Sequence, residues 1–142
     1  MTTTTTEDIF SLHSKGYICV IPVNCYGVAG AGLAKAWRDR DPAAYEVYAD
    51  ACGSRRILPG DLAYSANGWR LAATKNHWRN PSEKKWVAMI LYELEKLSKA
   101  YPERQIAVPL LGCGCGGLSK EWFLEEAQRI LKDCGNVVVC VR

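Results

Sequence analysis

The amino-acid sequence predicts an α/β protein built on a central mixed sheet with helices on both faces. Apolar segments of strand length, such as residues 16–24 and 106–111, alternate with helical segments along the chain, which is typical of a sheet covered on both faces. Asn67-Gly68 separates two further apolar segments, and this dipeptide favours a tight antiparallel hairpin. A hairpin within an otherwise alternating pattern predicts that the sheet is mixed.

Length and composition predict a single domain over residues 1–142. The chain has 49% hydrophobic and 23% charged residues, with 18 basic and 15 acidic side chains, values that are ordinary for a globular domain. A chain of this length buries roughly two thirds of its unfolded surface, so it needs neither metal ions nor disulfides to hold a core. Residues 1–6 form either a disordered end or a β-prone edge strand.

The same inspection excludes several classes of protein. No window contains the roughly 18 to 20 apolar residues of a membrane span, and the N-terminus lacks the basic start and apolar stretch of a secretory signal. We therefore expect a cytoplasmic protein. The cysteines number seven, without a framework spacing, and are expected to be reduced thiols. Because no Cys-x-x-Cys pair occurs and both histidines are distant from Cys113 and Cys115, we expect no metal site.

The first half of the chain predicts a strand, a glycine-rich loop and two helices, in that order. The strand at residues 16–24 leads into a loop at residues 27–32, and a helix follows directly. Asp41-Pro42 is an N-cap followed by proline at the first helical position. It predicts a second helix, which Gly53 ends.

The second half predicts a hairpin, a long helix, a strand, a shorter helix and a last strand. Ser119 is expected to cap the shorter helix, and Gly135 to stop it. The strand before that helix ends in a second glycine-rich loop, at residues 112–117. In such folds, ligands bind at the edge of the sheet formed by the carboxyl ends of the strands. Both glycine loops are expected at that edge. The strands are expected at residues 62–66, 69–74, 106–111 and 136–141, and the long helix at residues 82–100.

Each glycine loop joins the end of a strand to the start of a helix. This arrangement directs backbone N–H groups and the positive end of a helix dipole toward one point, and glycine lets an anion approach closely. Either loop alone is equally well explained as a tight turn in which backbone packs on backbone. Two such loops favour a diphosphate ligand, such as a nucleotide diphosphate. Neither loop matches the Walker motif or the dinucleotide-binding fingerprint.

The residues around both loops resemble those of the macrodomain superfamily, whose α/β/α modules bind ADP-ribose. The resemblance lies in Val23-Asn24 and in residues 27–34 and 109–118. It spans essentially the whole chain and implies a three-layer α/β/α macrodomain.

Within that superfamily, residues 24–28, 73–79 and 112–118 are most similar to the DarG antitoxin branch. DarG-type domains remove ADP-ribose from thymidine bases of DNA, whereas the related terminal ADP-ribose protein glycohydrolase removes it from glutamate. The most specific segment is Thr74-Lys-Asn-His-Trp-Arg79, which ordinary macrodomains lack.

The resemblance implies roles for individual residues. Asp8 matches the acidic residue that accepts a hydrogen bond from the adenine amino group, although a solvated acid or an N-cap explains it equally well. Asn24 matches the asparagine that orients the distal ribose; otherwise it is a strand-end residue that bonds its own backbone. The implied ADP-ribose contacts are Asp8, Ile9, Asn24, Gly30, Ala31, Gly32, Leu33, Gly112, Cys113, Gly114, Cys115, Gly116, Gly117 and Leu118.

Lys75 matches the lysine to which the DarG branch ascribes catalysis, with Asn24 and His77 as the other implied catalytic residues. A free lysine is almost wholly protonated at neutral pH and is a poor nucleophile. A partly dry cleft beside other cations would favour the neutral amine. That amine would attack the anomeric carbon of the distal ribose and form a ring-opened imine, which water hydrolyses. Without the residues that flank it, Lys75 would be interpreted as a solvated lysine.

The residues after Lys75 also have two interpretations. His77 is either an acid or base for the departing group or a structural histidine. Trp78 and Arg79 are followed by Lys84 and Lys85, and rings interleaved with cations bind single-stranded nucleic acid. A core tryptophan beside a solvated helix face is the alternative.

The sequence departs from both relatives. Gly116 stands where the glutamate-directed relative has an aspartate, and Ala29 and Ala31 stand where the DarG pattern has methionine and a basic residue. The first departure disfavours glutamyl substrates.

The implied function is a monomeric macrodomain hydrolase that removes ADP-ribose from a macromolecule such as single-stranded DNA. It is expected to need no cofactor and to bind no membrane. The alternatives are a non-catalytic reader of ADP-ribose and a phosphatase acting on ADP-ribose 1″-phosphate.

Overall fold

The computed structural model describes residues 3–141, and within them a six-stranded sheet has the order β1-β6-β5-β2-β4-β3. Five of these strands run parallel, and β3 pairs antiparallel with β4 at one edge. The prediction of a mixed sheet is therefore confirmed. The strands are β1 (Thr3–Thr5), β2 (Ile18–Val23), β3 (Leu62–Tyr64), β4 (Trp69–Ala73), β5 (Ile106–Pro109) and β6 (Val137–Cys140).

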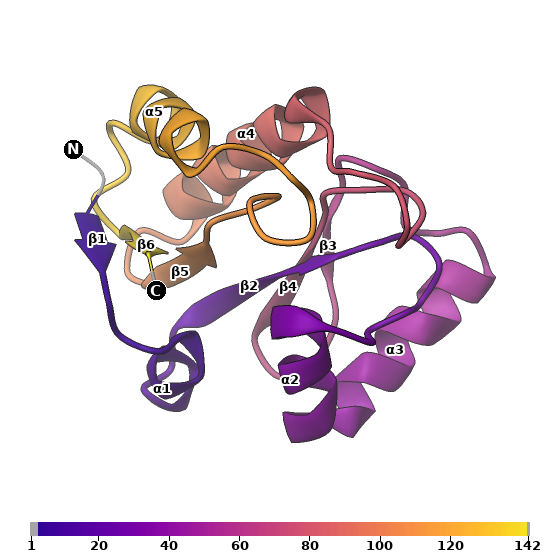
Figure 1. The fold of residues 1–142 in the computed structure, drawn as a ribbon. Coiled ribbons are helices and arrows are strands. Elements are labelled where there is room, and N and C mark those ends of the chain that lie inside the picture. The colour runs from indigo at the N-terminus through magenta and orange to yellow at the C-terminus, as the bar shows by residue number, and fades with distance from the viewer. Residues whose placement is uncertain (1–2, 142) are drawn as a thin grey trace.

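Helices cover both faces of this sheet (Figure 1). One face packs against α1 (Ile9–Ser14), α2 (Gly32–Arg40) and α3 (Pro42–Gly53), and the other against α4 (Lys84–Ala100) and α5 (Lys120–Ile130). Two separate hydrophobic clusters result, because successive strand residues point to opposite faces. The predicted three-layer α/β/α architecture is confirmed.

Local signals account for the hairpin and for two helix starts. Asn67 and Gly68 have φ of 56° and 84°, the left-handed values that a type I′ turn requires. The Asp41 side chain caps α3 by accepting from the Ala44 N–H at 3.1 Å. Ser119 caps α5 by accepting from the Trp122 N–H at 3.1 Å. These three predictions are confirmed.

Other bounds differ from those predicted. The helix expected to run to Gly135 ends at Ile130, since the chain turns there and the Cys134 N–H donates to the Leu131 carbonyl. This early turn lets the buried Asn136 side chain donate to the carbonyls of Tyr101 and Arg104. The long helix begins at Lys84 rather than at residue 82, and the strands are one to three residues shorter than expected.

At the N-terminus, the edge-strand interpretation holds for β1, which pairs with β6, while residues 1 and 2 lie outside the described part. Helix α1 was not predicted, because its six residues are too few to show a helical period. Among the helices of residues 3–141, none has the length and apolarity needed to cross a membrane.

Asp41 also connects α3 to the hairpin. Its second oxygen accepts from Asn67 Nδ2 at 3.0 Å and from Trp69 Nε1 at 2.9 Å. Burial disfavours the charged carboxylate, but the hydrogen bonds from Asn67, the Ala44 N–H and Trp69 together lower the pKa of Asp41 below its ordinary value. The ionised form of Asp41 therefore stabilises the fold.

We expect Asp41→Ala to lower the free energy of unfolding at pH 7 by about 2 kcal/mol, because it removes an N-cap and leaves two donors without their acceptor. Since folding lowers this pKa, the stabilisation is complete above the unfolded value near 3.9 and is lost as the pH falls through the folded value. Urea unfolding from about pH 7 to about pH 2 measures the decline. Asp39→Ala, at an exposed ion pair with Lys35, is the matched control and should cost under about 0.5 kcal/mol. A difference between parent and Asp41→Ala that is independent of pH would contradict this account.

Candidate active site

Three loops meet at the carboxyl edge of the sheet. They follow the neighbouring parallel strands β5, β2 and β4, and they are the two glycine loops and the segment that contains Lys75. The Thr74 N–H donates to the Val23 carbonyl at 3.2 Å, and the Cys25 N–H donates to the Asn76 carbonyl at 2.8 Å. Lys75 Nζ donates to the Cys115 carbonyl at 3.4 Å. The Lys75 segment is therefore bonded to the second glycine loop and to Val23 and Cys25, which precede the first.

Asn24 holds the first glycine loop in shape. Its buried side chain accepts from the Tyr26 N–H at 2.9 Å and from the Tyr48 hydroxyl at 3.0 Å, and its Nδ2 donates to the Val28 carbonyl at 2.8 Å. The Asn24 amide thus bonds to nearby backbone groups of the loop that follows it. This is the alternative to ribose binding that its position at a strand end also predicts. Orientation of the distal ribose by Asn24 stays a prediction.

The first glycine loop ends at a helix start that no side chain caps. Ala31 is the N-cap of the nine-residue helix α2 and makes no side-chain hydrogen bond, and the first turn has no acidic residue. Gly30, Ala31 and Gly32 are exposed. The positive end of α2 is therefore directed at solvent, which suits it to an anion.

The second glycine loop is packed against itself. The Leu118 N–H donates to the Gly112 carbonyl at 2.9 Å, and the Ser82 N–H donates to the Gly116 carbonyl at 2.9 Å. A Cβ at Gly116 would lie 2.5 Å from the Gly112 carbonyl oxygen and against Ser82 Oγ. At Gly114, by contrast, a Cβ would meet nothing within 4 Å. This loop conformation therefore excludes an aspartate at residue 116.

Lys75 is half-buried where β4 ends. Within residues 3–141, no carboxylate oxygen lies within 4.0 Å of its Nζ. Its amine therefore adjoins backbone of the second glycine loop without an acidic partner, where it can reach a sugar bound over that loop.

The residues after Lys75 form a chain of planar groups. The His77 ring stacks on Trp78 at 5.3 Å between centroids, and the Arg79 guanidinium lies 4.6 Å from the centroid of the Trp78 ring. His77 Nδ1 accepts from the Arg79 N–H at 3.0 Å, so the proton of the neutral ring is on Nε2. Trp78 is 44% exposed. The interpretation of Trp78 as a core residue is therefore wrong.

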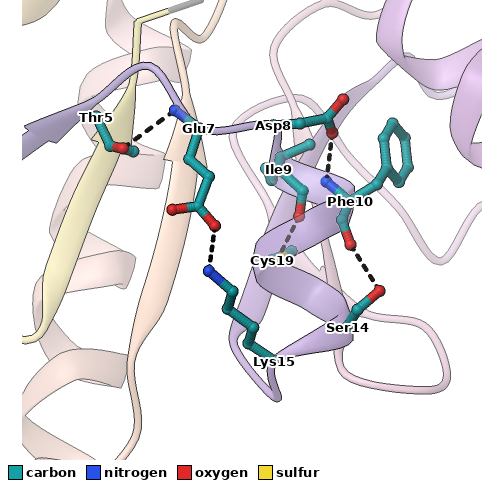
Figure 2. Close-up of polar contacts among 8 residues, drawn as sticks. All are labelled: Thr5, Glu7, Asp8, Ile9, Phe10, Ser14, Lys15 and Cys19. Carbon is teal, nitrogen blue, oxygen red and sulfur yellow. Dashed lines mark hydrogen bonds and ion pairs between the residues drawn. The ribbon is translucent and has the colours of Figure 1, made fainter.

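Asp8 lies after β1, at the opposite end of the same edge. It caps α1, with Oδ1 accepting from the Phe10 N–H at 2.7 Å (Figure 2). This is the N-cap interpretation of the residue, and contact with adenine stays a prediction. Ile9 is buried in the core beneath it.

The cysteines are free thiols. Burial raises the pKa of Cys25 to about 11 and also raises the pKa of Cys113, so both stay protonated at neutral pH and are poor nucleophiles. Within residues 3–141, no group of three or more histidine, cysteine or acidic side chains is placed to hold a metal ion. Neither Cys25 nor Cys113 is therefore a candidate nucleophile.

The overall structure is similar to solved macrodomains. The macrodomain of Mycobacterium tuberculosis DarG matches with a TM-score of 0.86 and 26% sequence identity, over 98% of this chain and 95% of that one. This chain is a macrodomain of the DarG-like branch. The Thermus aquaticus DarG macrodomain matches with a TM-score of 0.83 and 28% identity, again over 98% and 95% of the two chains. No family model matches the sequence.

The curated relatives of this macrodomain are longer proteins. The DNA ADP-ribosyl glycohydrolase of Thermus aquaticus is 32% identical over 84% of this chain and 35% of its own length. A DNA ADP-ribosyl transferase-DNA ADP-ribosyl glycohydrolase fusion protein of Thermosipho africanus is 32% identical over 78% and 34%. This macrodomain therefore spans about a third of the length of the curated relatives it matches. A structure of Thermosipho africanus DarTG in complex with ADP-ribose matches with a TM-score of 0.78 and 28% identity, over 93% of this chain and 39% of that one.

Two surface hollows of this macrodomain lie away from the three loops. One, of about 460 Å³, lies between β3 and α4, beside Leu62 and Met89. The other, of about 330 Å³, lies near the end of α4, beside Ser98 and Asn136. Neither is lined by a predicted site residue.

Sequence reasoning missed three residues that shape the site of this macrodomain. Tyr48 donates to Asn24 from α3, Ser82 packs beneath Gly116, and the exposed Tyr26 ring lies edge-on to His77 with centroids 4.7 Å apart. Only Tyr26 had a local signal, since it is a large aromatic residue directly before a glycine loop. The other two come from distant segments, so no local pattern indicates them.

Proposed function

We propose that this macrodomain binds ADP-ribose across the carboxyl edge of its sheet and hydrolyses the bond between the distal ribose and a thymidine base of DNA. The observation that carries this proposal is the Lys75 amine, held against the second glycine loop at 3.4 Å from the Cys115 carbonyl. Relatives named DNA ADP-ribosyl glycohydrolases support the choice of DNA. The ADP-ribose complex of a related structure supports the choice of ligand.

The order of strands supports one orientation of the ligand. Along the edge, Asp8 follows β1, the glycine loops follow β5 and β2, and Lys75 follows β4. The strands that precede Asp8 and Lys75 are four positions apart in the sheet. At about 4.8 Å between neighbouring strands, roughly 19 Å separates the two residues. Adenine would lie at Asp8 and Ile9, the diphosphate between the uncapped start of α2 and the second glycine loop, and the distal ribose at Lys75.

In the proposed reaction, the neutral amine of Lys75 attacks the anomeric carbon of the distal ribose. The new carbon–nitrogen bond forms as the bond to the thymine nitrogen breaks, and the protonated form of His77 gives its Nε2 proton to the departing base. The ribose ring opens to give an imine with Lys75. Water then adds to the imine, which frees the lysine and releases ADP-ribose.

The experiment that tests this function offers two substrates side by side, an oligonucleotide with ADP-ribosylated thymidine and a protein with ADP-ribosylated glutamate. Chromatography measures the released ADP-ribose. We expect release from the oligonucleotide. Tight binding without release from either substrate would instead establish a reader, and release of inorganic phosphate from ADP-ribose 1″-phosphate would establish a phosphatase.

We expect Ala31→Asp to weaken the binding of free ADP-ribose at least about tenfold, because a carboxylate at the N-cap occupies the N–H groups of α2 and repels the diphosphate. The same substitution should stabilise the unliganded protein by about 0.5–1 kcal/mol through the new cap. Calorimetry measures the affinity, and thermal unfolding measures the stability. Ala31→Ser, which caps without charge, should weaken binding less. Unchanged affinity in Ala31→Asp would place the diphosphate elsewhere.

A further inference from the structure

Tyr26 is a large aromatic residue whose side chain contributes little to the packing of the fold. It is 57% exposed, and it belongs to neither hydrophobic cluster. Within residues 3–141, its hydroxyl makes no hydrogen bond, and its ring contacts the His77 ring edge-on at 67° between the planes. An exposed aromatic ring with so little packing has a face free for a ligand.

The backbone around Tyr26 is nevertheless held in place. Its N–H donates to Asn24 Oδ1 at 2.9 Å, and the preceding Cys25 N–H donates to the Asn76 carbonyl at 2.8 Å. Cys25 Sγ also lies 3.7 Å from the Lys75 carbonyl. Tyr26 is therefore fixed beside the segment that contains the proposed nucleophile, immediately before the first glycine loop.

Tyr26 also begins a series of planar groups. His77 contacts it, Trp78 stacks on His77 with 25° between the planes, and Arg79 lies over Trp78. Within residues 3–141, no carboxylate lies within 4.0 Å of the Arg79 guanidinium. A row of aromatic rings that ends at an arginine offers stacking surfaces for nucleobases and a positive charge for the phosphate backbone.

We propose that Tyr26 is a specificity-determining residue that stacks on the nucleobase joined to ADP-ribose. This inference rests on the proposed function, since it concerns the group that departs from the distal ribose. A thymine is planar, so it can stack on an aromatic ring beside the scissile bond and bind more tightly. A glutamate side chain is flexible and has no planar ring to stack on the tyrosine. Tyr26 therefore favours nucleobase-linked over glutamate-linked ADP-ribose.

The test measures binding in the Lys75→Ala background, so that turnover cannot intervene. Calorimetry compares free ADP-ribose with an ADP-ribosylated thymidine oligonucleotide, for Tyr26, Tyr26→Phe and Tyr26→Ala. We expect the oligonucleotide to bind more tightly than free ADP-ribose. Tyr26→Ala should reduce this advantage by about 10- to 100-fold, as expected for loss of one stacked base. Tyr26→Phe should keep it within about threefold, and free ADP-ribose should bind all three proteins alike.

Three results would overturn the inference. In the first, the oligonucleotide binds the Tyr26→Ala protein as tightly as the protein that keeps Tyr26. In the second, the oligonucleotide binds no more tightly than free ADP-ribose in any variant. The third is an equal loss of affinity for both ligands, which would show that Tyr26 only shapes the loop. Failure of the proposed function is a separate result, because a protein that never releases ADP-ribose can still show the stacking advantage in binding.

Discussion

Lys75→Ala should lower the rate of ADP-ribose release from thymidine-linked DNA at least about a thousandfold, the scale seen when the nucleophile of a covalent mechanism is removed. The fold should be unaffected, because the side chain is half-buried and its amine makes one long hydrogen bond to Cys115. Free ADP-ribose should bind within about threefold of the parent. Single-turnover kinetics and calorimetry measure the two quantities.

Two controls separate nucleophilic attack from simple charge stabilisation. Lys75→Arg keeps a cation that does not deprotonate at neutral pH, so it should be as inactive as Lys75→Ala. Borohydride added during turnover should trap the imine as a stable adduct on Lys75 in the parent protein, seen by mass spectrometry. Lys35→Ala, at an exposed ion pair on α2, is the matched lysine variant and should keep the parental rate. Turnover of Lys75→Ala at that rate would refute the assignment.

Gly116→Ala should lower the free energy of unfolding by about 2–3 kcal/mol, the scale of overpacking a tightly packed position. Its Cβ would lie 2.5 Å from the Gly112 carbonyl oxygen, which is backbone and cannot rotate away. The second glycine loop must then shift, so the affinity for ADP-ribose should also fall at least about tenfold. Chemical denaturation and calorimetry test the two expectations.

Gly114→Ala is the matched control for stability, because a Cβ there meets nothing within 4 Å. We expect it to change the free energy of unfolding by less than about 0.5 kcal/mol. Gly116→Asp should be at least as unstable as Gly116→Ala and should gain no activity on glutamate-linked ADP-ribose. Equal stability of Gly116→Ala and Gly114→Ala would show that this loop is not packed as described.

Asn24 and Trp78 illustrate where sequence reasoning about the site was incomplete. The sequence placed Asn24 at a strand end, but its bond with Tyr48 depends on how α3 packs on β2, which no local pattern records. For Trp78, the sequence is equally consistent with a core and a surface position. The structure places its ring outside both hydrophobic clusters, under Arg79. Burial is a property of the whole fold, so one tryptophan in a polar segment does not reveal it.

Local features of this macrodomain were determined by the sequence alone. The Asp41 and Ser119 caps, the turn at Asn67-Gly68 and the two glycine loops depend on residues only a few positions apart, so short-range sterics and hydrogen bonding suffice to predict them.

The tertiary structure decided which of those features meet. The order β5-β2-β4 brings Lys75 to the Cys115 carbonyl, although 40 residues separate them in the chain. It also places Tyr26 beside His77 and excludes a side chain at Gly116. These relations arise from strand pairing and the packing of two helical layers, which are long-range interactions that no short segment contains.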